Sequence, residues 1–321
     1  MMEVFTLHDA IPHDNNTIIT VGTFDGVHKG HQFIIESMLT LQQKKKDART
    51  VIVTFDPHPQ TVIPRKDKPP ITLLSDISER LQLLESYGID MVVIIPFTKE
   101  FAQTSSDEFI RTYIHEKIGF SDIFIGHDHG FGKAREGGAN TLHALSEELQ
   151  FTVHPIEPYV IDHKTVSSTE IRKALSNGNL PEAFDMLGHP YFIEGIVIKG
   201  DQRGRTIGFP TANIKPAIHY KLFPRKGVYF VSTDINGITV YGMANIGNRP
   251  TVGVTDQISL EVHFFDVNED LYDTQLVIWF LKYIREEQAF ASLNHLKDQL
   301  HRDEMTCREI MDSLDNIEDE S

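Results

Sequence analysis

The sequence has 321 residues and a mass of 36.5 kDa, a length that favours two domains over one. Its formal net charge of −16 argues against sequence-independent nucleic-acid binding, which needs a basic surface, but it leaves room for a local pocket that binds a nucleotide. The first residues lack the pattern of a signal peptide and no apolar run approaches the roughly 18 residues of a membrane span, so we expect a cytoplasmic protein without a membrane partner.

Apolar runs bounded by turn residues predict the strands of the first half. The runs are "TIITVG", "TVIVTF", "DMVVIIPF" and "SDIFIG". Because their hydrophobicity is continuous rather than alternating, we expect strands buried on both faces of a parallel sheet with crossover helices. The helices are predicted at "GHQFIIESMLTLQQKKK" and "SDISERLQLLESYG"; the second begins with a capping-box pattern around Ser75, Ser78 and Glu79 and ends at Gly88.

The second half has a different composition. Runs such as "YFIEGIVIKG", "KGVYFVSTDINGITVYGMANIG" and "TQLVIWFLKYI" are rich in β-branched and aromatic residues, and "INGI" is a strong hairpin signal. We therefore predict a small antiparallel barrel or sandwich that ends with the helix "SLNHLKDQLHRDEMTCREIMDSL" and a frayed acidic tail, "DSLDNIEDES". The predicted domains are residues 1–185 and 186–321.

The single cysteine, Cys307, lies in this last predicted helix. One cysteine excludes an intrachain disulfide and fits a reducing compartment, and we interpret it as an incidental thiol. The oligomeric state is not predicted by any feature of the sequence.

The segment "TVGTFDGVHKGHQ" follows the first predicted buried strand and places His28 and His31 at the start of a helix. In open parallel sheets, a glycine-rich turn at this position lets backbone amides and a helix N-terminus approach phosphates. Imidazoles there can donate hydrogen bonds, or carry charge, as negative charge develops on a leaving pyrophosphate. With 16 His and 21 Gly in the chain, a chance H-x-G-H arises in about one sequence in twenty. The chain has neither a Walker loop nor a G-x-G-x-x-G motif.

Two further segments of the first half carry polar groups. In "VSSTEIRKAL", Ser167, Ser168 and Thr169 are suited to capping a helix that receives a phosphate, and Arg172 follows one turn later. The alternative is an ordinary surface cap with a solvated arginine. In "GHDHGFG", His127 and His129 form an H-x-H pattern, but the sequence offers no further ligands nearby that would make it a metal site.

In the second half, "KGDQRGRTIGFPTANI" combines glycines with basic residues. Gly200, Gly204 and Gly208 would let backbone amides approach phosphate, and the oxygens of Thr211 and Asn213 suit a Mg²⁺ ion bound with nucleotide phosphates. The alternative is a barrel corner, where curvature alone requires glycine.

These segments carry a family resemblance that covers nearly the whole chain in order. "GTFDGVHKGH" resembles the H-x-G-H signature of the nucleotidylyltransferase superfamily in the form found in bacterial bifunctional riboflavin kinase/FAD synthetases, and "VTFDPHP", "GHDHGFGKAREGG" and "VSSTEIRKAL" resemble its later motifs. "GRTIGFPTAN", "ANIGNRPTVG", "LEVHFFD", "DLYDTQL" and "IREEQAFASLNHLKDQL" resemble the flavokinase motifs. His129 departs from the pattern, where the family usually has an aromatic residue.

The resemblance implies a Rossmann-like, parallel-sheet α/β nucleotidylyltransferase domain followed by a small antiparallel β-barrel riboflavin kinase domain with a C-terminal helix. It implies that riboflavin, ATP and Mg²⁺ give FMN in the second domain, and that FMN and a second ATP give FAD and pyrophosphate in the first. Glu261 matches the family's base for the ribityl hydroxyl, although a lone Glu in a strand is otherwise a solvent-facing residue.

The expected site residues fall into four groups. The catalytic group is His28, His31, Arg172 and Glu261, and the Mg²⁺ ligands are Thr211 and Asn213. The flavin group is Phe55, Pro57, His58, Pro59 and, more weakly supported, Arg285. The nucleotide and phosphate group is Gly22, Thr23, Phe24, Asp25, Gly30, Asp128, Ser167, Ser168, Thr169, Gly200, Arg205, Gly208 and Pro210. Two rival functions are transfer of a nucleotidyl group to another small phosphate, and flavin binding by a regulator that has lost catalysis.

Overall fold

The computed structural model of the chain describes residues 1–66, 69–126, 130–200, 204, 207–249 and 257–318. The chain folds into two compact units, Met1–Ser168 and Thr169–Ser321, which we call the N-terminal and C-terminal units. The domain boundary that we place between residues 185 and 186 stays a prediction.

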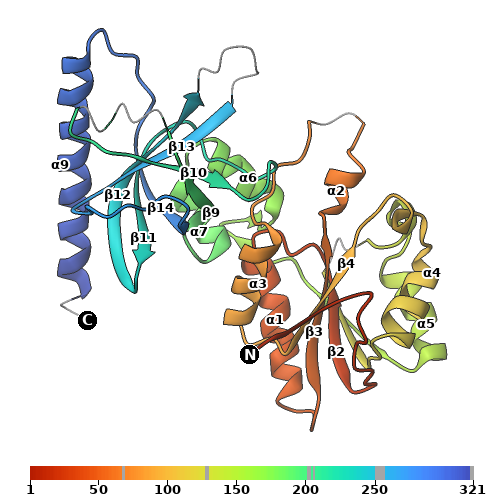
Figure 1. The fold of residues 1–321 in the computed structure, drawn as a ribbon. Coiled ribbons are helices and arrows are strands. Elements are labelled where there is room, and N and C mark those ends of the chain that lie inside the picture. Colours follow the sequence, from red (N-terminus) through yellow and green to blue (C-terminus); the bar gives the residue numbers. More distant parts are fainter. Residues whose placement is uncertain (67–68, 127–129, 201–203, 205–206, 250–256, 319–321) are drawn as a thin grey trace. The chain divides into compact units, whose positions relative to one another are not determined.

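The N-terminal unit is built on a six-stranded parallel sheet in the order β1-β4-β3-β2-β5-β6 (Figure 1). The strands are β1 Glu3–Thr6, β2 Thr17–Val21, β3 Arg49–Asp56, β4 Met91–Pro96, β5 Asp122–Gly126 and β6 Thr152–Ile156. From β2 the chain moves outward through β3 and β4, then returns to add β5 on the other side of β2. Ligands of such sheets bind at this reversal, beyond the carboxyl end of the strand.

Helices cover both faces of this sheet. Ile35 of α1 and Leu84 of α3 pack against Ile52 on one face, and Phe109 with Leu142 of α5 belong to the core of the other face. The helical elements are α1 Lys29–Gln42, α2 Pro59–Val62, α3 Ile77–Ser86, η1 Phe101–Gln103, α4 Ser106–Glu108, η2 Phe109–Glu116, η3 Lys133–Arg135 and α5 Ala139–Leu149, and a hairpin of β7 Val160–Ile161 and β8 Lys164–Thr165 follows β6. The predicted parallel α/β architecture is confirmed.

One helix start needs correction. The residue that caps α3 is Asp76, not Ser75 or Ser78: its carboxylate accepts from the amide of Glu79, and the Glu79 carboxylate accepts in return from the amide of Asp76. Aspartate forms this reciprocal box as well as serine does, and the bond that Ser75 makes is to the amide of Gly26 instead.

The C-terminal unit holds a closed antiparallel barrel in the order β10-β13-β12-β11-β14-β9 (Figure 1). Its elements are α6 Ser168–Ser176, which begins at the last residue of the N-terminal unit, α7 Leu180–Leu187, β9 Tyr191–Ile198, β10 Ala212–Pro216, β11 Gly227–Ile235, β12 Ile238–Arg249, β13 Gln257–Phe264, β14 Gln275–Arg285 and α9 Leu293–Glu318. Asn236 and Gly237, with φ of 55° and 81°, form the predicted hairpin turn between β11 and β12. The predicted barrel is confirmed.

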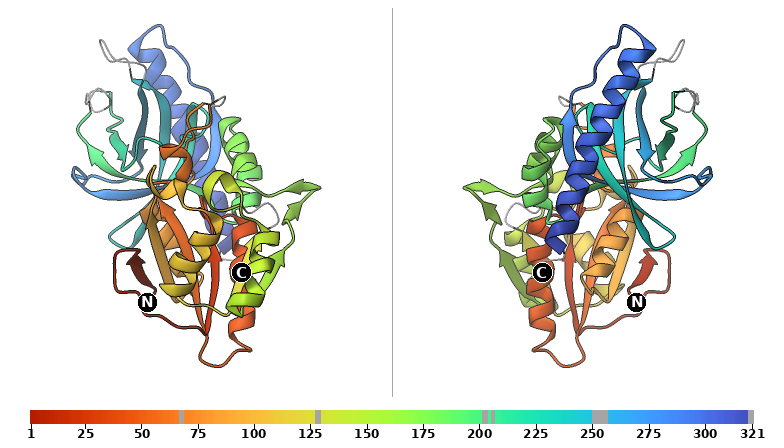
Figure 2. Two further views of the ribbon diagram at one scale, coloured as in Figure 1. Left: turned by 90° about the vertical axis from the view of Figure 1, so that its right-hand side faces the viewer. Right: turned by 90° about the vertical axis from the view of Figure 1, so that its left-hand side faces the viewer.

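The long helix α9 lies along the outside of the barrel, as Figure 2 shows. Cys307 is fully buried there in a cluster with Phe230 and Met243. Burial, with Asp303 and Glu304, raises the pKa of the Cys307 thiol to about 12, which fits an unreactive thiol. The expected frayed tail is wrong up to residue 318, because α9 continues to Glu318 through a segment without glycine or proline.

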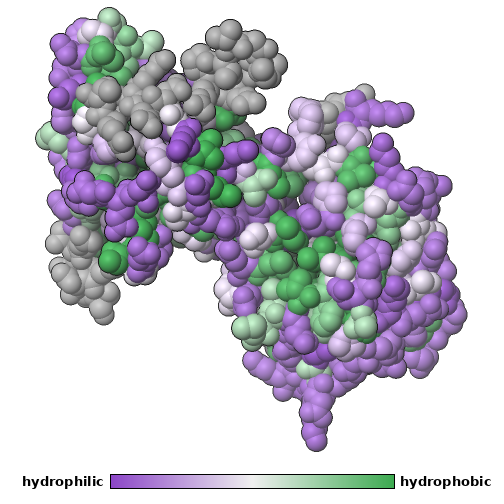
Figure 3. Space-filling model, in the orientation of Figure 1, coloured by the Kyte–Doolittle hydropathy of each residue, from purple (hydrophilic) through white to green (hydrophobic). Residues whose placement is uncertain are grey.

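Hydrophilic side chains dominate much of the visible surface of the N-terminal unit (Figure 3). Across the described residues, none of the helices is both long enough and apolar enough to span a bilayer.

Candidate active sites

The loop between β2 and α1 carries the two predicted histidines. His28 is the N-cap residue of α1 and its carbonyl accepts from the amide of His31 at 2.7 Å. The two imidazole rings stack with centroids 3.7 Å apart and planes 15° from parallel. The first turn of α1 has no acidic residue, so the helix N-terminus beside this pair favours an anion.

Aromatic rings lie close to the backbone of two glycines in this loop. A Cβ on Gly22 would lie 3.0 Å from the ring of Phe24, and one on Gly30 would lie 3.2 Å from the ring of His28. Phe24, which is buried and has φ of 50°, packs in turn on His31 with ring centroids 4.7 Å apart. The predicted Gly22, Phe24 and Gly30 thus shape the histidine pair.

His31 lies in an environment that disfavours its charged form. Burial, the neighbouring His28 and the cation of Arg80 all lower its pKa well below 6.5. Its Nδ1 is buried and has no hydrogen-bond partner among the residues that the structure describes. At neutral pH His31 is therefore an uncharged ring that can donate or accept a hydrogen bond, rather than the carrier of a charge.

Asp25 connects the loop between β2 and α1 to other segments of the N-terminal unit. Its Oδ1 accepts from the amides of Leu74 at 2.9 Å and Ser75 at 3.0 Å, and its carbonyl accepts from the hydroxyl of Ser168 at 3.1 Å. The adjacent amide of Gly26 donates to the Ser75 hydroxyl at 2.8 Å. These contacts fix the position of the loop, and a phosphate contact of Asp25 stays a prediction.

A cavity of about 520 Å³ opens beside the same loop, beyond the carboxyl ends of β2, β3 and β4. It brings together the predicted Gly22, Thr23, Phe55, His58 and Pro59. The remaining wall is largely aromatic and comes from Phe97, Phe101, Phe109 and Phe131. An apolar cavity of this size with a few polar groups suits a flat aromatic ligand. The exposed Pro57 does not line it.

His58 is a buried polar residue of this cavity. Its Nδ1 accepts from the amide of Gln60 at 3.1 Å, so the neutral ring carries its proton on Nε2. Next to it in sequence, the carboxyl of Asp56 has its pKa raised by burial, against the opposing effect of Arg80.

Arg80 on α3 is a residue that sequence reasoning missed. Its side chain is buried, with an exposed fraction of 1%. Nη1 donates to the hydroxyl of Thr54 at 2.8 Å and to the carbonyl of Phe55 at 3.0 Å. An arginine within an amphipathic helix pattern is normally solvated, so the only available signal was its position on the apolar side of that helix.

In the C-terminal unit, three predicted polar residues meet on the strand pair β10 and β13. Asn213 lies directly opposite Glu261 in the antiparallel register, and Thr211 immediately precedes β10. The Thr211 hydroxyl donates to Oε2 of Glu261 at 3.4 Å. Asn245 of β12 lies opposite Glu261 on the other side and was not predicted.

The glycine before this strand pair has a specific role. A Cβ on Gly200 would lie 2.2 Å from Nδ2 of Asn213, whose side chain is buried. Gly208 has φ of 91°, and the carbonyl of Pro210 accepts from Nδ1 of His263 at 2.8 Å. Thr211 and Pro210 also line a small cavity of about 80 Å³ together with Tyr272.

Arg285 makes a different contact from the one expected. Its guanidinium pairs with both carboxylate oxygens of Asp303, with Nη2 to Oδ2 at 2.6 Å, and joins the end of β14 to α9. Asp303 is 2% exposed and Arg285 is partly buried, so this is a partly buried, bidentate pair. A contact from Arg285 to flavin stays a prediction.

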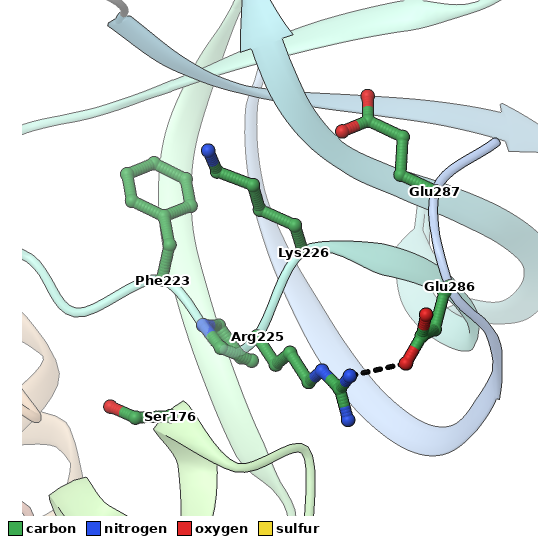
Figure 4. Close-up of a pocket in the computed structure, with 7 residues that line it drawn as sticks. Ser176, Phe223, Arg225, Lys226, Glu286 and Glu287 are labelled. Carbon is green, nitrogen blue, oxygen red and sulfur yellow. Dashed lines mark hydrogen bonds and ion pairs between the residues drawn. The ribbon is translucent and has the colours of Figure 1, made fainter. Parts of the chain in front are cut away.

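A second large cavity, of about 450 Å³, lies in the C-terminal unit, and none of the expected residues lines it (Figure 4). Arg225 and Lys226 line it together with Glu286 and Glu287, and Arg225 is paired with Glu286. Since the two positive and two negative charges balance, this cavity lacks the net positive charge that would attract a phosphate.

The other expected residues lie either outside the described part of the chain or at α6. Asp128, His129 and Arg205 lie outside the described residues. Ser167 immediately precedes α6, and Thr169 and Arg172 lie on that helix within the C-terminal unit. A role for these residues at the histidine pair stays a prediction.

Comparison with known proteins covers both units. Residues 10–170 match the FAD synthetase family and residues 187–311 match the riboflavin kinase family. The chain is 38% identical to the bifunctional riboflavin kinase/FMN adenylyltransferase of Escherichia coli strain K12, over 91% of this chain and 92% of the relative. It is 36% identical to the Bacillus subtilis protein of the same name, over 93% of this chain and 95% of the relative.

A solved structure from Streptococcus pneumoniae, described as a macrolide-efflux protein, has the same fold. It superposes with a TM-score of 0.85 at 29% identity and covers 96% of this chain and 99% of its own. The efflux function in that description belongs to the Streptococcus pneumoniae protein, and we carry over only its fold.

Proposed function

Because this chain belongs to the family of bifunctional riboflavin kinase/FMN adenylyltransferases, we propose that it makes FAD from riboflavin in two steps. The barrel transfers the γ-phosphoryl group of ATP to riboflavin, which gives FMN and ADP. The parallel-sheet unit then joins FMN to the AMP part of a second ATP, which gives FAD and pyrophosphate.

The observation that carries the second step is the stacked pair of His28 and His31 beside the aromatic cavity. We assign the cavity to the flavin ring and the N-terminus of α1, with the two imidazoles, to the triphosphate. A phosphate oxygen of FMN attacks the α-phosphorus, and the bond to the β-phosphate oxygen breaks. The neutral ring of His31 and the imidazole of His28 donate hydrogen bonds to the departing pyrophosphate and stabilise the charge that develops there. Arg172 is proposed to add a positive charge at the same place.

Riboflavin phosphorylation, the first step, is assigned to Thr211, Asn213 and Glu261. Glu261 accepts the proton of the ribityl 5′-hydroxyl. The ribityl oxygen bonds to the γ-phosphorus, and the bond between the γ-phosphorus and ADP breaks. The oxygens of Thr211 and Asn213 are of the kind that a hard divalent cation prefers, and Gly200 leaves the space that Asn213 occupies. The family uses ATP with a divalent metal, and we propose Mg²⁺, which would neutralise phosphate charge there.

The proposed partners are the small molecules ATP, riboflavin and FMN, with no nucleic acid, and the proposed location is the cytoplasm, where ATP is available. The net charge of −16 supports the exclusion of nucleic acid.

The test is a time course with purified protein, riboflavin, ATP and Mg²⁺, followed by separation of the flavins. We expect FMN first and FAD after it, and loss of both with a chelator. FMN without FAD would contradict the assignment of the N-terminal unit and favour another acceptor for the nucleotidyl group. No new flavin at all would favour a binding protein without catalysis. Parallel reactions with Mn²⁺ and Ca²⁺ test the choice of metal.

A further inference from the structure

The contacts of the buried Arg80 connect parts of the N-terminal unit that are separate in sequence. From α3, its Nη1 donates to the Phe55 carbonyl and to the Thr54 hydroxyl at the end of β3. The Thr54 hydroxyl in turn donates to the carbonyl of Thr23 at 3.2 Å, in the loop that leads to the histidines. One guanidinium thus reaches the loop through a single threonine.

Both ends of this chain of hydrogen bonds belong to the proposed site. Thr23 and Phe55 line the aromatic cavity, and Thr23 lies five residues before His28. A second set of contacts runs in parallel, because Asp25 and Gly26 bind the backbone and hydroxyl of residues 74 and 75 just before α3. The loop is therefore held in two places, by residues 74 and 75 just before α3 and, through Thr54, by Arg80 within α3.

Stability alone does not account for an arginine at this place. Arg80 is 1% exposed, and within the described part of the chain its Nε has no hydrogen-bond partner. Burying a cation with an unpaired donor is unfavourable, and an apolar side chain of similar length would avoid that cost. The carboxylates whose charges act on Arg80 are those of Asp25, Asp56, Asp76 and Glu79.

We propose that Arg80 is a positioning residue for FMN adenylylation: through Thr54 it sets the spacing between the histidine loop and the flavin cavity. It does not touch the reacting atoms, and the proposal rests on the function assigned above to this unit. Because a misplacement of about 1 Å at a reacting centre costs on the order of 100-fold in rate, a loose link here reduces kcat more than it weakens binding. Burial and His28 are the larger causes of the lowered pKa of His31, and the charge of Arg80 adds to them.

The experiment compares Arg80→Met with Arg49→Met in the full-length chain. Arg49 is a matched control, because it also binds a threonine hydroxyl and backbone carbonyls, but at the opposite end of β3. We expect Arg80→Met to lower kcat for FMN adenylylation by about 100-fold, with a smaller change in KM. Riboflavin phosphorylation by the same molecules should be unchanged, and thermal unfolding followed by circular dichroism checks that the N-terminal unit is folded. An equal loss in Arg49→Met, or a wild-type kcat in Arg80→Met, would overturn the proposal.

A second variant and a second readout cover the case in which Arg80→Met does not fold. Thr54→Val keeps the arginine and the shape of the threonine but removes the link to Thr23, and we expect adenylylation to fall by about 10-fold. A wild-type rate in Thr54→Val would overturn the proposal.

The second readout needs no activity. NMR of ¹³C-labelled histidine in Arg80→Lys and Arg80→Gln should show His31 titrating at a higher pH only in the glutamine variant, because the lysine keeps the charge. An unchanged His31 titration in Arg80→Gln would contradict the electrostatic part. If the wild-type protein makes no FAD, the proposed function fails, whereas this titration still reports on Arg80.

Discussion

In the N-terminal unit the proposed site is carried by a loop, whereas in the C-terminal unit it is carried by two paired strands. The histidine loop, residues 22–28, contains three residues with positive φ, Phe24, Gly26 and Val27. Its shape is held by the bond from the Leu74 amide to Asp25 and by the packing of Phe24 on His31. Asn213 and Glu261 lie opposite each other through strand register, and Thr211, just before β10, contacts Glu261. A loop site therefore depends on distant residues such as Arg80, and a strand site depends on its immediate neighbours.

The largest effect that tests this comparison is expected at Glu261. Glu261→Gln keeps the shape of the side chain but removes the base, so riboflavin phosphorylation should fall by about 10²–10⁴-fold. FAD formation from supplied FMN should stay near the wild-type rate. The control is Glu194→Gln, which alters a buried carboxylate of the same barrel, one that accepts from Gln275. Loss of both activities in Glu261→Gln would show that the two sites are not separate.

His31→Ala should give the opposite result. Without this donor the adenylylation of FMN should fall by about 10²–10³-fold, while riboflavin phosphorylation continues. His154→Ala provides the matched control, since that ring also stacks on an aromatic neighbour, Phe124, at 15°. If His154→Ala costs as much as His31→Ala, the loss comes from packing and the role of His31 is wrong.

A smaller effect separates the two kinds of site through glycine. Gly200→Ala places a methyl 2.2 Å from the buried Asn213 amide, whereas Gly30→Ala places one 3.2 Å from the His28 ring, which needs to move only slightly. We expect Gly200→Ala to lower phosphorylation by roughly 10-fold and Gly30→Ala to lower adenylylation by less. Initial rates of each reaction measure this. A larger loss from Gly30→Ala would mean that the loop is the more rigid of the two sites.

The smallest effect is on stability against pH. Because the pKa of His31 is lowered in the folded state, the unfolded chain takes up a proton as pH falls through about 6.5 and the folded chain does not. His31 therefore contributes less to stability below that pH than above it. Urea unfolding at pH 5.5 and 7.5, followed by circular dichroism, should show a smaller pH dependence in His31→Gln than in the wild type. The same slope in both proteins would contradict a lowered pKa.

Sequence reasoning predicted the central strands because β2, β3, β4 and β5 are buried and read as continuous apolar runs. It did not find β1 and β6, since each is an edge strand with one neighbour and a mixed burial pattern. Periodicity and turn signals also predicted antiparallel strands and α9, because the hairpin turn and the amphipathic spacing of the helix are local features. They left a barrel and a sandwich open, and the family resemblance implied the barrel.

The site was predictable where chemistry is written into a short motif. His28, His31, Thr211 and Asn213 are such residues, whereas Glu261 was predicted only through the family resemblance. The structure puts the two histidines together and the other three residues together. Arg80 was not predictable, because its burial arises from the packing of α3 against β3, and no local pattern encodes that contact. The anchoring role of Asp25 depends in the same way on residues 74 and 75.

If one chain holds two separate sites for consecutive reactions, a mixture of two variants that each lack one reaction should carry out both. Glu261→Gln and His31→Ala are each incubated with riboflavin, ATP and Mg²⁺, alone and together, and the flavins are separated over time. We predict no FMN or FAD from the first variant, FMN alone from the second, and FAD from the mixture after a lag in which free FMN accumulates. FMN that accumulates in the mixture without conversion to FAD would contradict separate sites.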